Sequence, residues 1–163
     1  MSLYLRMFNA CIVLIFLFLF EVDAQEEKQQ YVIAPAFSVQ DIYGENIALV
    51  NQLEDKPVML YFWATWCPFC KKETPRLVEF YNKFAEKINV IGVNVDVNNS
   101  VEKINDYINE FGVRFPIIYD IDHLITPAYR VDGTPVFVVI SQSQHILYRG
   151  HRFPAGIEQA LGD

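Results

Sequence analysis

The stretch YFWATWCPFCKKETP, residues 61–75, decides the fold class of this chain. It begins inside the apolar segment Val58–Ala64, and a continuous apolar run is typical of a central strand buried on both faces. Pro68 suits the first turn of a helix, where the missing N–H has no helix partner to lose. The two cysteines, Cys67 and Cys70, are therefore predicted between a strand's carboxyl end and a helix's start, where open α/β sheets carry their chemistry.

Strand and helix patterns alternate along the rest of the chain. Apolar residues recur every three or four positions over 77–88 and 101–111, which predicts two helices, the second capped by Ser100 and ended by Gly112. The predicted strands are 37–40, 47–49, 58–64, 90–95, 117–119, 136–140 and 145–149, with short helical segments at 124–130 and 155–161. This order predicts an α/β fold with a mixed central sheet flanked by helices and an N-terminal β-hairpin.

The first 24 residues have the pattern of an export signal. Arg6 precedes an apolar run that ends at Phe20, and the small residues Val22 and Ala24 suit a signal peptidase, so we expect cleavage after Ala24. The alternative is that residues 1–24 remain as an N-terminal membrane anchor, because the run is only just long enough to span a bilayer. We expect a flexible tether at 25–34, a single domain at 35–163, and a periplasmic location, soluble or anchored to the inner membrane.

Composition excludes several classes of protein. The chain is 52% hydrophobic and 15% aromatic, which argues against disorder, and its net charge is −7. No cluster of Lys and Arg exists to neutralise phosphates, so nucleic acid is not an expected partner. Cys11 lies within the apolar run, and the exported domain therefore contains only Cys67 and Cys70.

The spacing of these two cysteines predicts thiol-disulfide exchange. Cys67 at a helix N-terminus faces unpaired N–H groups, which favour the thiolate and make it the nucleophile. Cys70, one turn later, is placed to attack a mixed disulfide on Cys67. A structural disulfide over so short a loop would remove little chain entropy. A zinc site lacks the other ligands at a suitable spacing, so no metal is expected.

Three further positions are candidates for roles at this site. Glu73 lies three residues after Cys70 on the same side of the helix, where it either handles the proton of that thiol or merely interacts with the helix dipole. Pro75 inside the helix is expected to bend it. Pro135 marks the start of the strand 136–140, and the sequence alone does not show whether its peptide bond is cis.

With these residues in view, the chain resembles the exported thioredoxin-fold proteins of the TlpA/ResA/CcmG (DsbE) group. The resemblance covers about residues 35–152 and rests on residues 61–75 together with IGVNVD (91–96), FPIIYD (115–120), YRVDGTPVFVVI (129–140) and ILYRG (146–150). Cytosolic thioredoxins carry a buried aspartate where this chain has Tyr61, and they lack the helical insert near 100–111. The resemblance implies a thioredoxin-like fold with that insert.

The resemblance also implies roles for individual residues. Cys67 becomes the exposed attacking thiol, Cys70 the buried resolving thiol, and Glu73 the acidic residue beside the active site. Pro135 becomes the cis-proline facing the disulfide, and Thr134 offers its backbone to an extended substrate. Trp66, Pro68 and Phe69 are further candidates for contact with that substrate.

The function implied is reduction of specific protein disulfides outside the cytoplasm, such as those of apocytochrome c or copper-oxidase assembly proteins. The partners would be these protein clients and a membrane electron donor of the DsbD/CcdA type, with no cofactor beyond the redox-active disulfide, and we expect a monomer. Two alternatives stay open: an oxidant of the DsbA kind that introduces disulfides, and a binding or chaperone module whose cysteines do not turn over. The peroxidatic P-x-x-x-T-x-x-C pattern of peroxiredoxins is absent.

Overall fold

The computed structural model describes residues 31–96 and 100–162. Tyr31–Asp163 form one compact unit around a five-stranded mixed sheet with the strand order β5-β4-β3-β6-β7. The first three of these strands run parallel, and β6 is antiparallel to both β3 and β7.

The strands are β1 (Ser38–Gln40), β2 (Asn46–Ala48), β3 (Val58–Trp63), β4 (Asn89–Asn94), β5 (Ile117–Tyr119), β6 (Val136–Ile140) and β7 (Ile146–Gly150), with β1 and β2 forming a separate antiparallel pair. The helices are α2 (Leu49–Gln52), α3 (Pro68–Phe84), α4 (Val101–Phe111), α5 (Ile125–Ala128) and α6 (Ile157–Ala160).

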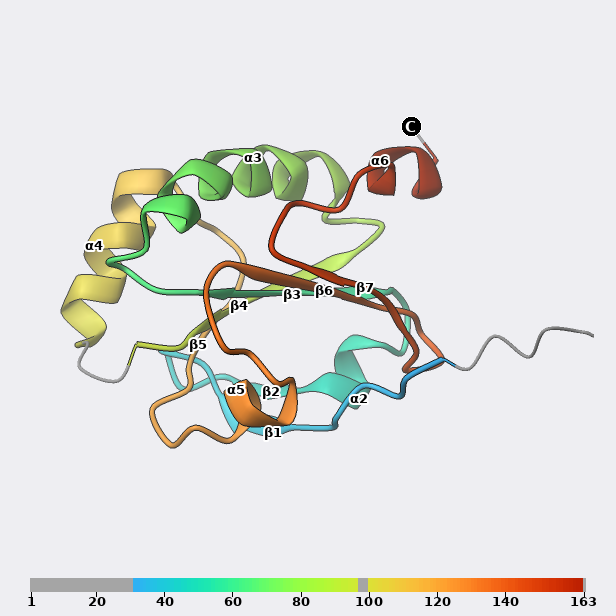
Figure 1. Ribbon diagram of the computed structural model, residues 1–163, viewed down its shortest axis with the longest axis horizontal. Coiled ribbons are helices and arrows are strands. Elements are labelled where there is room, and N and C mark those ends of the chain that lie inside the picture. Colours follow the sequence, from blue (N-terminus) through green and yellow to red (C-terminus); the bar gives the residue numbers. More distant parts are fainter. Residues whose placement is uncertain (1–30, 97–99, 163) are drawn as a thin grey trace, which may run out of the picture. The chain divides into compact units, whose positions relative to one another are not determined.

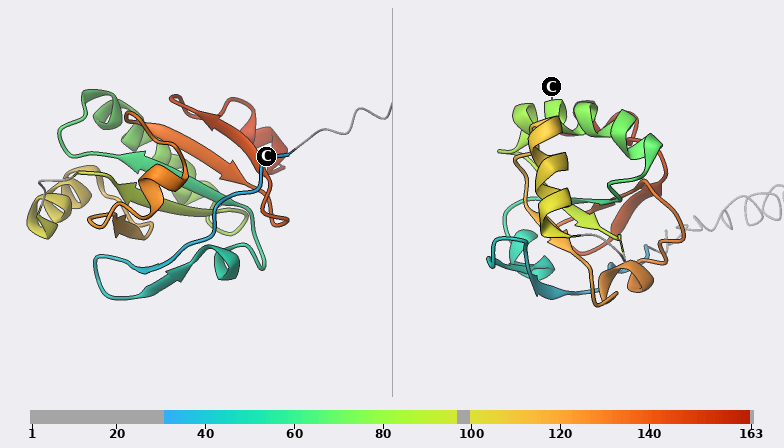
Figure 2. Two further views of the ribbon diagram at one scale, coloured as in Figure 1. Left: turned by 60° about the horizontal axis from the view of Figure 1, so that its bottom comes forward. Right: turned by 90° about the vertical axis from the view of Figure 1, so that its left-hand side faces the viewer.

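The five-stranded sheet is covered on both faces (Figures 1 and 2). Helices α3, α4 and α6 cover one face, called here the α3 face, while β1, β2, α2 and α5 cover the other, called the hairpin face. Side chains of a strand alternate between faces, so β3 sends Tyr61 and Trp63 into the α3 face and Leu60 and Phe62 into the hairpin face. Every residue of β3 is buried, as the continuous apolar run predicted.

Each predicted strand is confirmed to within one residue. The cap signals of α4 are also confirmed: Ser100 Oγ accepts a hydrogen bond from the backbone N–H of Lys103, and Gly112 takes the left-handed conformation with φ 66°. One element, α2, was not predicted, because four residues are too few to show a helical period. The thioredoxin-like architecture, with an N-terminal hairpin and a helix inserted between β4 and β5, agrees with the expectation from the resemblance.

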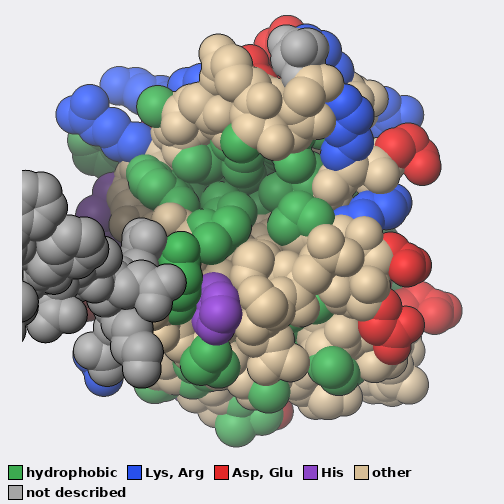
Figure 3. Space-filling view, turned by 90° about the vertical axis from the view of Figure 1, so that its right-hand side faces the viewer, with side chains coloured by type: hydrophobic (Ala, Val, Ile, Leu, Met, Phe, Trp, Pro, Cys, Tyr) green, Lys and Arg blue, Asp and Glu red, His purple; other side chains and the backbone are tan. Residues whose placement is uncertain are grey.

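The start of the described chain is paired with the hairpin between β6 and β7. Ala34 N–H donates to the carbonyl of Gln144, and the N–H of Ile146 donates to the carbonyl of Val32. Residues 31–34 therefore belong to the domain, although they were predicted as the end of a tether. At the end of the sheet away from the disulfide, hydrophobic side chains gather on the surface (Figure 3).

The predicted signal or anchor at 1–24, with Cys11, and the tether residues 25–30 lie outside the described residues. Among residues 31–96 and 100–162, no helix has the length and apolar character needed to cross a bilayer.

Candidate redox site

Cys67 and Cys70 form a disulfide at the start of α3, with their Cα atoms 5.2 Å apart. Cys67 is the N-cap of the helix, and its Sγ accepts a hydrogen bond of 3.1 Å from the backbone N–H of Cys70. Pro68 occupies the first helical position, as predicted, and its fixed φ starts the helix directly after the first cysteine. The sulfur of Cys67 therefore lies at the positive end of the α3 dipole, where negative charge is stabilised.

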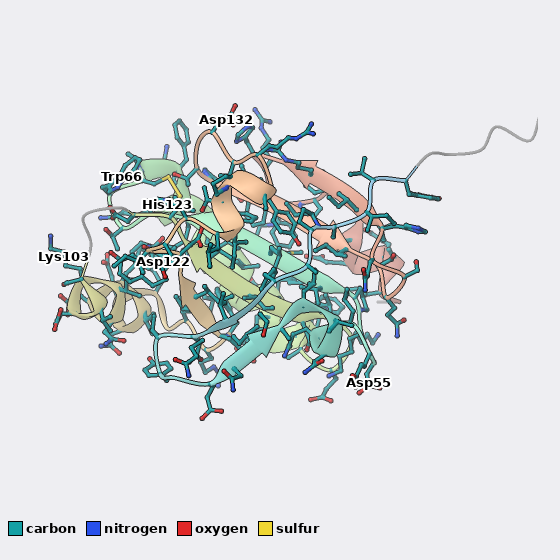
Figure 4. The ribbon with its side chains drawn as sticks, turned by 90° about the horizontal axis from the view of Figure 1, so that it is seen from below. Asp55, Trp66, Lys103, Asp122, His123 and Asp132 are labelled. Atoms are coloured by element: carbon teal, nitrogen blue, oxygen red, sulfur yellow. A yellow bond between two sulfur atoms is a disulfide. The ribbon has the colours of Figure 1, made fainter. Side chains whose placement is uncertain are left out.

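Both cysteines are buried while the disulfide is closed. Cys67 is 2% exposed and Cys70 is fully buried, so the expectation of an exposed attacking thiol is wrong for this state. The flanking aromatic residues are exposed instead, Trp66 by 66% and Phe69 by 64%. Figure 4 shows Trp66 beside the disulfide, with His123 from the loop between β5 and α5 at the same end of the sheet.

The turn before β6 faces the sulfur of Cys67. The Thr134–Pro135 peptide bond is cis, as the resemblance implied. The carbonyl oxygen of Thr134 lies 3.5 Å from Cys67 Sγ. The hydroxyl of Thr134 is buried and has no partner within the described chain. The carbonyl of the residue before the cis bond therefore lies next to the disulfide.

A cavity of about 430 Å³ opens beside this turn. Its lining joins the first turns of α3, the cis-proline turn and the residues after β7, namely Phe69, Glu73, Thr134, Pro135, His151 and Arg152. Glu73 is half-buried there. His151 Nδ1 lies 2.9 Å from the carbonyl oxygen of Pro135. Because a carbonyl oxygen only accepts hydrogen bonds, Nδ1 is the donor in this contact.

Three buried hydroxyls lie beneath Cys70. Tyr61 OH, from β3, donates to the carbonyl oxygen of Cys70 at 3.2 Å and lies 3.0 Å from Thr74 Oγ1. Thr74 Oγ1 donates to the same carbonyl at 2.9 Å and lies 2.7 Å from Tyr107 OH of α4. Burial raises the pKa of Tyr61 far above its usual value and that of Tyr107 to about 12, so both are neutral at physiological pH.

The loop between β3 and α3 is attached to the neighbouring strand. Thr65 Oγ1 donates to Asp96 Oδ2 at 2.9 Å, and the N–H of Asp96 donates to Asn94 Oδ1 at 3.2 Å. Because Thr65 lies two residues before Cys67, these bonds hold the approach to the helix against the end of β4.

All eight site residues predicted from the sequence lie in this one region, around the start of α3 and the cis-proline turn. Sequence reasoning missed His151 and Arg152 on the cavity wall and the hydroxyls of Tyr61, Thr74 and Tyr107 beneath Cys70. The register of the β6–β7 pair could have revealed His151: Gly150 pairs with Phe137, so the next residue lies close to Pro135.

Within the described ranges, no three His, Cys, Asp or Glu side chains group in a way that could hold a metal ion. The chemistry available at the site is that of the disulfide and its dithiol. A polarised sulfur at a helix N-terminus, with a partner sulfur bonded to it, is suited to exchange of disulfides with another thiol protein.

Comparisons with known proteins agree with this chemistry. The sequence profile of the AhpC/TSA family matches residues 32–149. The thiol-disulfide oxidoreductase ResA of Bacillus thuringiensis (strain Al Hakam) is 34% identical over 142 residues, covering 86% of this chain and 75% of that protein. The thioredoxin-like protein YneN of Bacillus subtilis (strain 168) is 34% identical over 75% of this chain and 69% of its own length. Among solved structures, a thiol:disulfide interchange protein of the thioredoxin family from Chlorobium tepidum TLS superposes with a TM-score of 0.69 at 26% identity, covering 83% of this chain and 99% of that one.

Proposed function

The chain belongs to the AhpC/TSA family and, within it, to the ResA-like thiol-disulfide oxidoreductases, and we propose that it reduces specific protein disulfides outside the cytoplasm. The family relation gives the class of reaction. The direction of electron flow, the location and the clients are the proposal, and the clients we favour are apocytochrome c or copper-oxidase assembly proteins.

The observation that carries the proposal is the position of Cys67 as the N-cap of α3. Its sulfur accepts the N–H of Cys70 and lies at the positive end of a 17-residue helix. In the reduced pair this environment stabilises negative charge on the Cys67 sulfur and so favours its thiolate. A thiolate on Cys67 supplies the nucleophile for attack on a client disulfide. Because a stabilised reduced form makes a dithiol pair more oxidising, the proposed direction of electron flow rests on the family relation and not on this position.

The reaction passes two electrons from the dithiol to the client in two exchange steps. The Cys67 thiolate attacks one sulfur of the client disulfide, forming a mixed disulfide and releasing the other client sulfur as a thiolate. Cys70, once deprotonated, attacks Cys67 Sγ and releases the remaining client thiolate. The enzyme ends with the closed disulfide, and the two client thiolates take up protons. A membrane donor of the DsbD/CcdA type would then reduce Cys67–Cys70 again.

Glu73 is the group we assign to the proton of Cys70. It lies on the same side of α3 as that cysteine, since residues three apart are neighbours on a helix. It is half-buried in the wall of the cavity next to the cis-proline turn. A carboxylate at this place can accept the proton when Cys70 becomes a thiolate and return it to the departing client.

The client would bind across the surface around the disulfide. Trp66 and Phe69 offer exposed aromatic surface, with Pro68 between the cysteines. The cis turn offers the backbone of Thr134, whose carbonyl lies next to Cys67 Sγ, beside Pro135. Main-chain contacts of this kind bind an extended peptide with little dependence on its sequence, whereas side-chain pockets give specificity.

Trapping of clients tests this function. In Cys70→Ser the first exchange proceeds and the second is blocked, so mixed disulfides between Cys67 and exported proteins should accumulate. The Cys67→Ser variant, which keeps the other cysteine, is the matched control and should trap none. The proposal fails if Cys67→Ser retains disulfide reduction, or if Cys70→Ser traps no exported protein.

The in vivo redox state tests the direction. A reductase should be found with Cys67 and Cys70 as a dithiol in cells that contain its donor, and should become oxidised when the donor is deleted. A pair that stays oxidised in both strains would identify an oxidant instead. A double Cys→Ser variant that still complements a deletion strain would identify a binding module.

A further inference from the structure

The carbonyl of Cys70 is the meeting point of three elements of the fold. Tyr61 from β3 and Thr74 from the second turn of α3 both donate to it, and Tyr107 from α4 reaches it through Thr74. Each hydroxyl carries one proton. With Thr74 and Tyr61 both donating to the carbonyl, Tyr107 donates to Thr74 Oγ1. This set, Tyr61, Thr74 and Tyr107, is called here the hydroxyl cluster.

The first turn of α3 needs such an attachment. Pro75 lies inside the helix and has no N–H, so the carbonyl of Lys71 loses its helix partner. The turn that carries both cysteines is therefore joined to the rest of α3 by fewer backbone hydrogen bonds than in a regular helix. The hydroxyl cluster adds bonds from the sheet and from α4 to that turn, at the residue that must close the disulfide.

The cluster is rigidly supported and uncharged. Tyr61 is 1% exposed and stacks on Phe137 with ring centroids 4.9 Å apart, and Tyr107 packs on Trp63 at 4.3 Å. Burial keeps the pKa of both tyrosines above their usual values, so they act as neutral hydrogen-bond groups. Their positions are therefore suited to fixing a backbone rather than to carrying charge.

We propose that the hydroxyl cluster is a positioning device that holds Cys70 where it can close onto Cys67. This rests on Cys67–Cys70 being the exchange pair, and it assigns three positioning residues to that pair. In the closing step the Cys70 thiolate attacks Cys67 Sγ of a mixed disulfide. The Cys67–Cys70 bond forms, the bond to the partner sulfur breaks, and the partner leaves as a thiolate. Holding the attacking sulfur in place raises its effective concentration.

The loss of one cluster hydroxyl should therefore weaken closure. Each variant loses the net free energy of one hydrogen bond. The equilibrium constant for oxidation of the dithiol and the rate of closure should therefore each fall about three- to tenfold. A tenfold fall makes the two-electron potential about 30 mV less negative. A purely structural role would lower the stability of both redox states alike and leave the potential unchanged.

The test is a redox titration of the purified protein against glutathione, combined with stopped-flow measurement of closure from a glutathione mixed disulfide on Cys67. Tyr61→Phe and Thr74→Val each remove one hydroxyl. Tyr129→Phe is the matched control, since it removes a buried tyrosine hydroxyl that donates to the carbonyl of Pro35 at 2.7 Å on the hairpin face. We expect both cluster variants to shift the potential and slow closure, and Tyr129→Phe to change only stability.

The inference is overturned if Tyr61→Phe lowers stability as Tyr129→Phe does while its potential and closure rate equal those of the wild type. Should Thr74→Val fail to fold, Tyr107→Phe replaces it, with a smaller expected shift because Tyr107 reaches Cys70 only through Thr74. The redox titration and the closure measurement use glutathione and need no client. Their result is therefore independent of the client-trapping test, so that either proposal can fail without the other.

Discussion

Tyr61 on the α3 face and Tyr129 on the hairpin face are both buried tyrosines whose hydroxyls donate to a backbone carbonyl. Their acceptors differ: Tyr61 bonds the redox-active Cys70, whereas Tyr129 bonds Pro35 in the segment before β1. Each face of the sheet packs a cluster of buried side chains, and the two cysteines belong to the cluster on the α3 face. Burial gives both tyrosines a part in stability, whereas the acceptor of each hydroxyl decides whether it also affects the chemistry of the disulfide.

The largest difference between the faces should come from the nucleophile itself. Cys67→Ser removes the sulfur that caps the N-terminus of α3, so we expect complete loss of disulfide reduction with little change in stability of the reduced protein. Tyr129→Phe, on the other face, should retain the full rate. A coupled insulin-reduction assay measures the activity, and thermal unfolding of the reduced proteins measures the stability. Disulfide reduction by Cys67→Ser would show that Cys67 is not the nucleophile.

A smaller loss is expected when Glu73 becomes Gln. The change keeps the shape of the side chain and removes the carboxylate that we assign to the Cys70 proton, so attack by Cys70 should slow by on the order of 100-fold near neutral pH. Stopped-flow measurement of closure across pH reports this loss. The control Glu79→Gln lies on the exposed side of the same helix and should have no effect. Equal closure rates in Glu73→Gln and Glu79→Gln would show that Glu73 is a surface acid without a role in closure.

The aromatic supports of the two tyrosines offer a more graded test. Phe137 stacks on Tyr61 at 4.9 Å, and Phe62 packs on Tyr129 at 5.5 Å, both fully buried. Phe137→Leu and Phe62→Leu should each lower the free energy of unfolding by about 1–2 kcal/mol in urea titrations. Only Phe137→Leu should also shift the glutathione equilibrium. A shift of the same size in Phe62→Leu would show that potential follows general stability.

The smallest difference between the two faces is expected at alkaline pH, where the buried tyrosines of both faces should lose their contribution to stability. Burial raises the pKa of Tyr107 to about 12 from 10.0, and it raises those of Tyr61 and Tyr129 further. A tyrosine whose pKa is higher in the folded protein contributes stability that is complete below pH 10 and is lost as the pH rises through the folded value. We therefore expect unfolding free energy to fall from pH 10 to 12, and the contributions of Tyr61, Tyr107 and Tyr129 to tyrosinate absorbance at 295 nm to appear only with unfolding. Ionisation of these three tyrosines before unfolding would contradict this.

Local signals in the sequence predicted the framework of the site. The apolar run of β3, Pro68 after the first cysteine and Pro75 in the helix each act through the backbone of their own segment, so their effects do not depend on distant residues. The same holds for Ser100 and Gly112 at the ends of α4. For this reason these elements form where they were expected, although α3 ends at Phe84, four residues before the end of the predicted period at 77–88.

Other features of the site depend on residues far apart in the chain. Tyr61, Thr74 and Tyr107 meet only because β3, α3 and α4 pack together, and a tyrosine in a buried strand gives no sign of its hydroxyl partner. The cis bond before Pro135 has a low prior, about 5–6% of such bonds, and only the family resemblance indicated it. The burial of Cys67 in the closed state was likewise not predicted. The position of Cys67 at a helix N-terminus bears on the charge of its sulfur and not on the exposure of that sulfur to solvent.

The sequence by itself determined where the two cysteines lie in the order of strand and helix, and hence the class of chemistry, because spacing, proline and periodicity are properties of a short segment. Only the tertiary structure decided what surrounds them: the cis turn against Cys67, the cavity shared by Glu73 and His151, and the hydroxyls on the carbonyl of Cys70. Those contacts join segments 9 to more than 60 residues apart, and their geometry exists only when the sheet and its two covering layers are assembled.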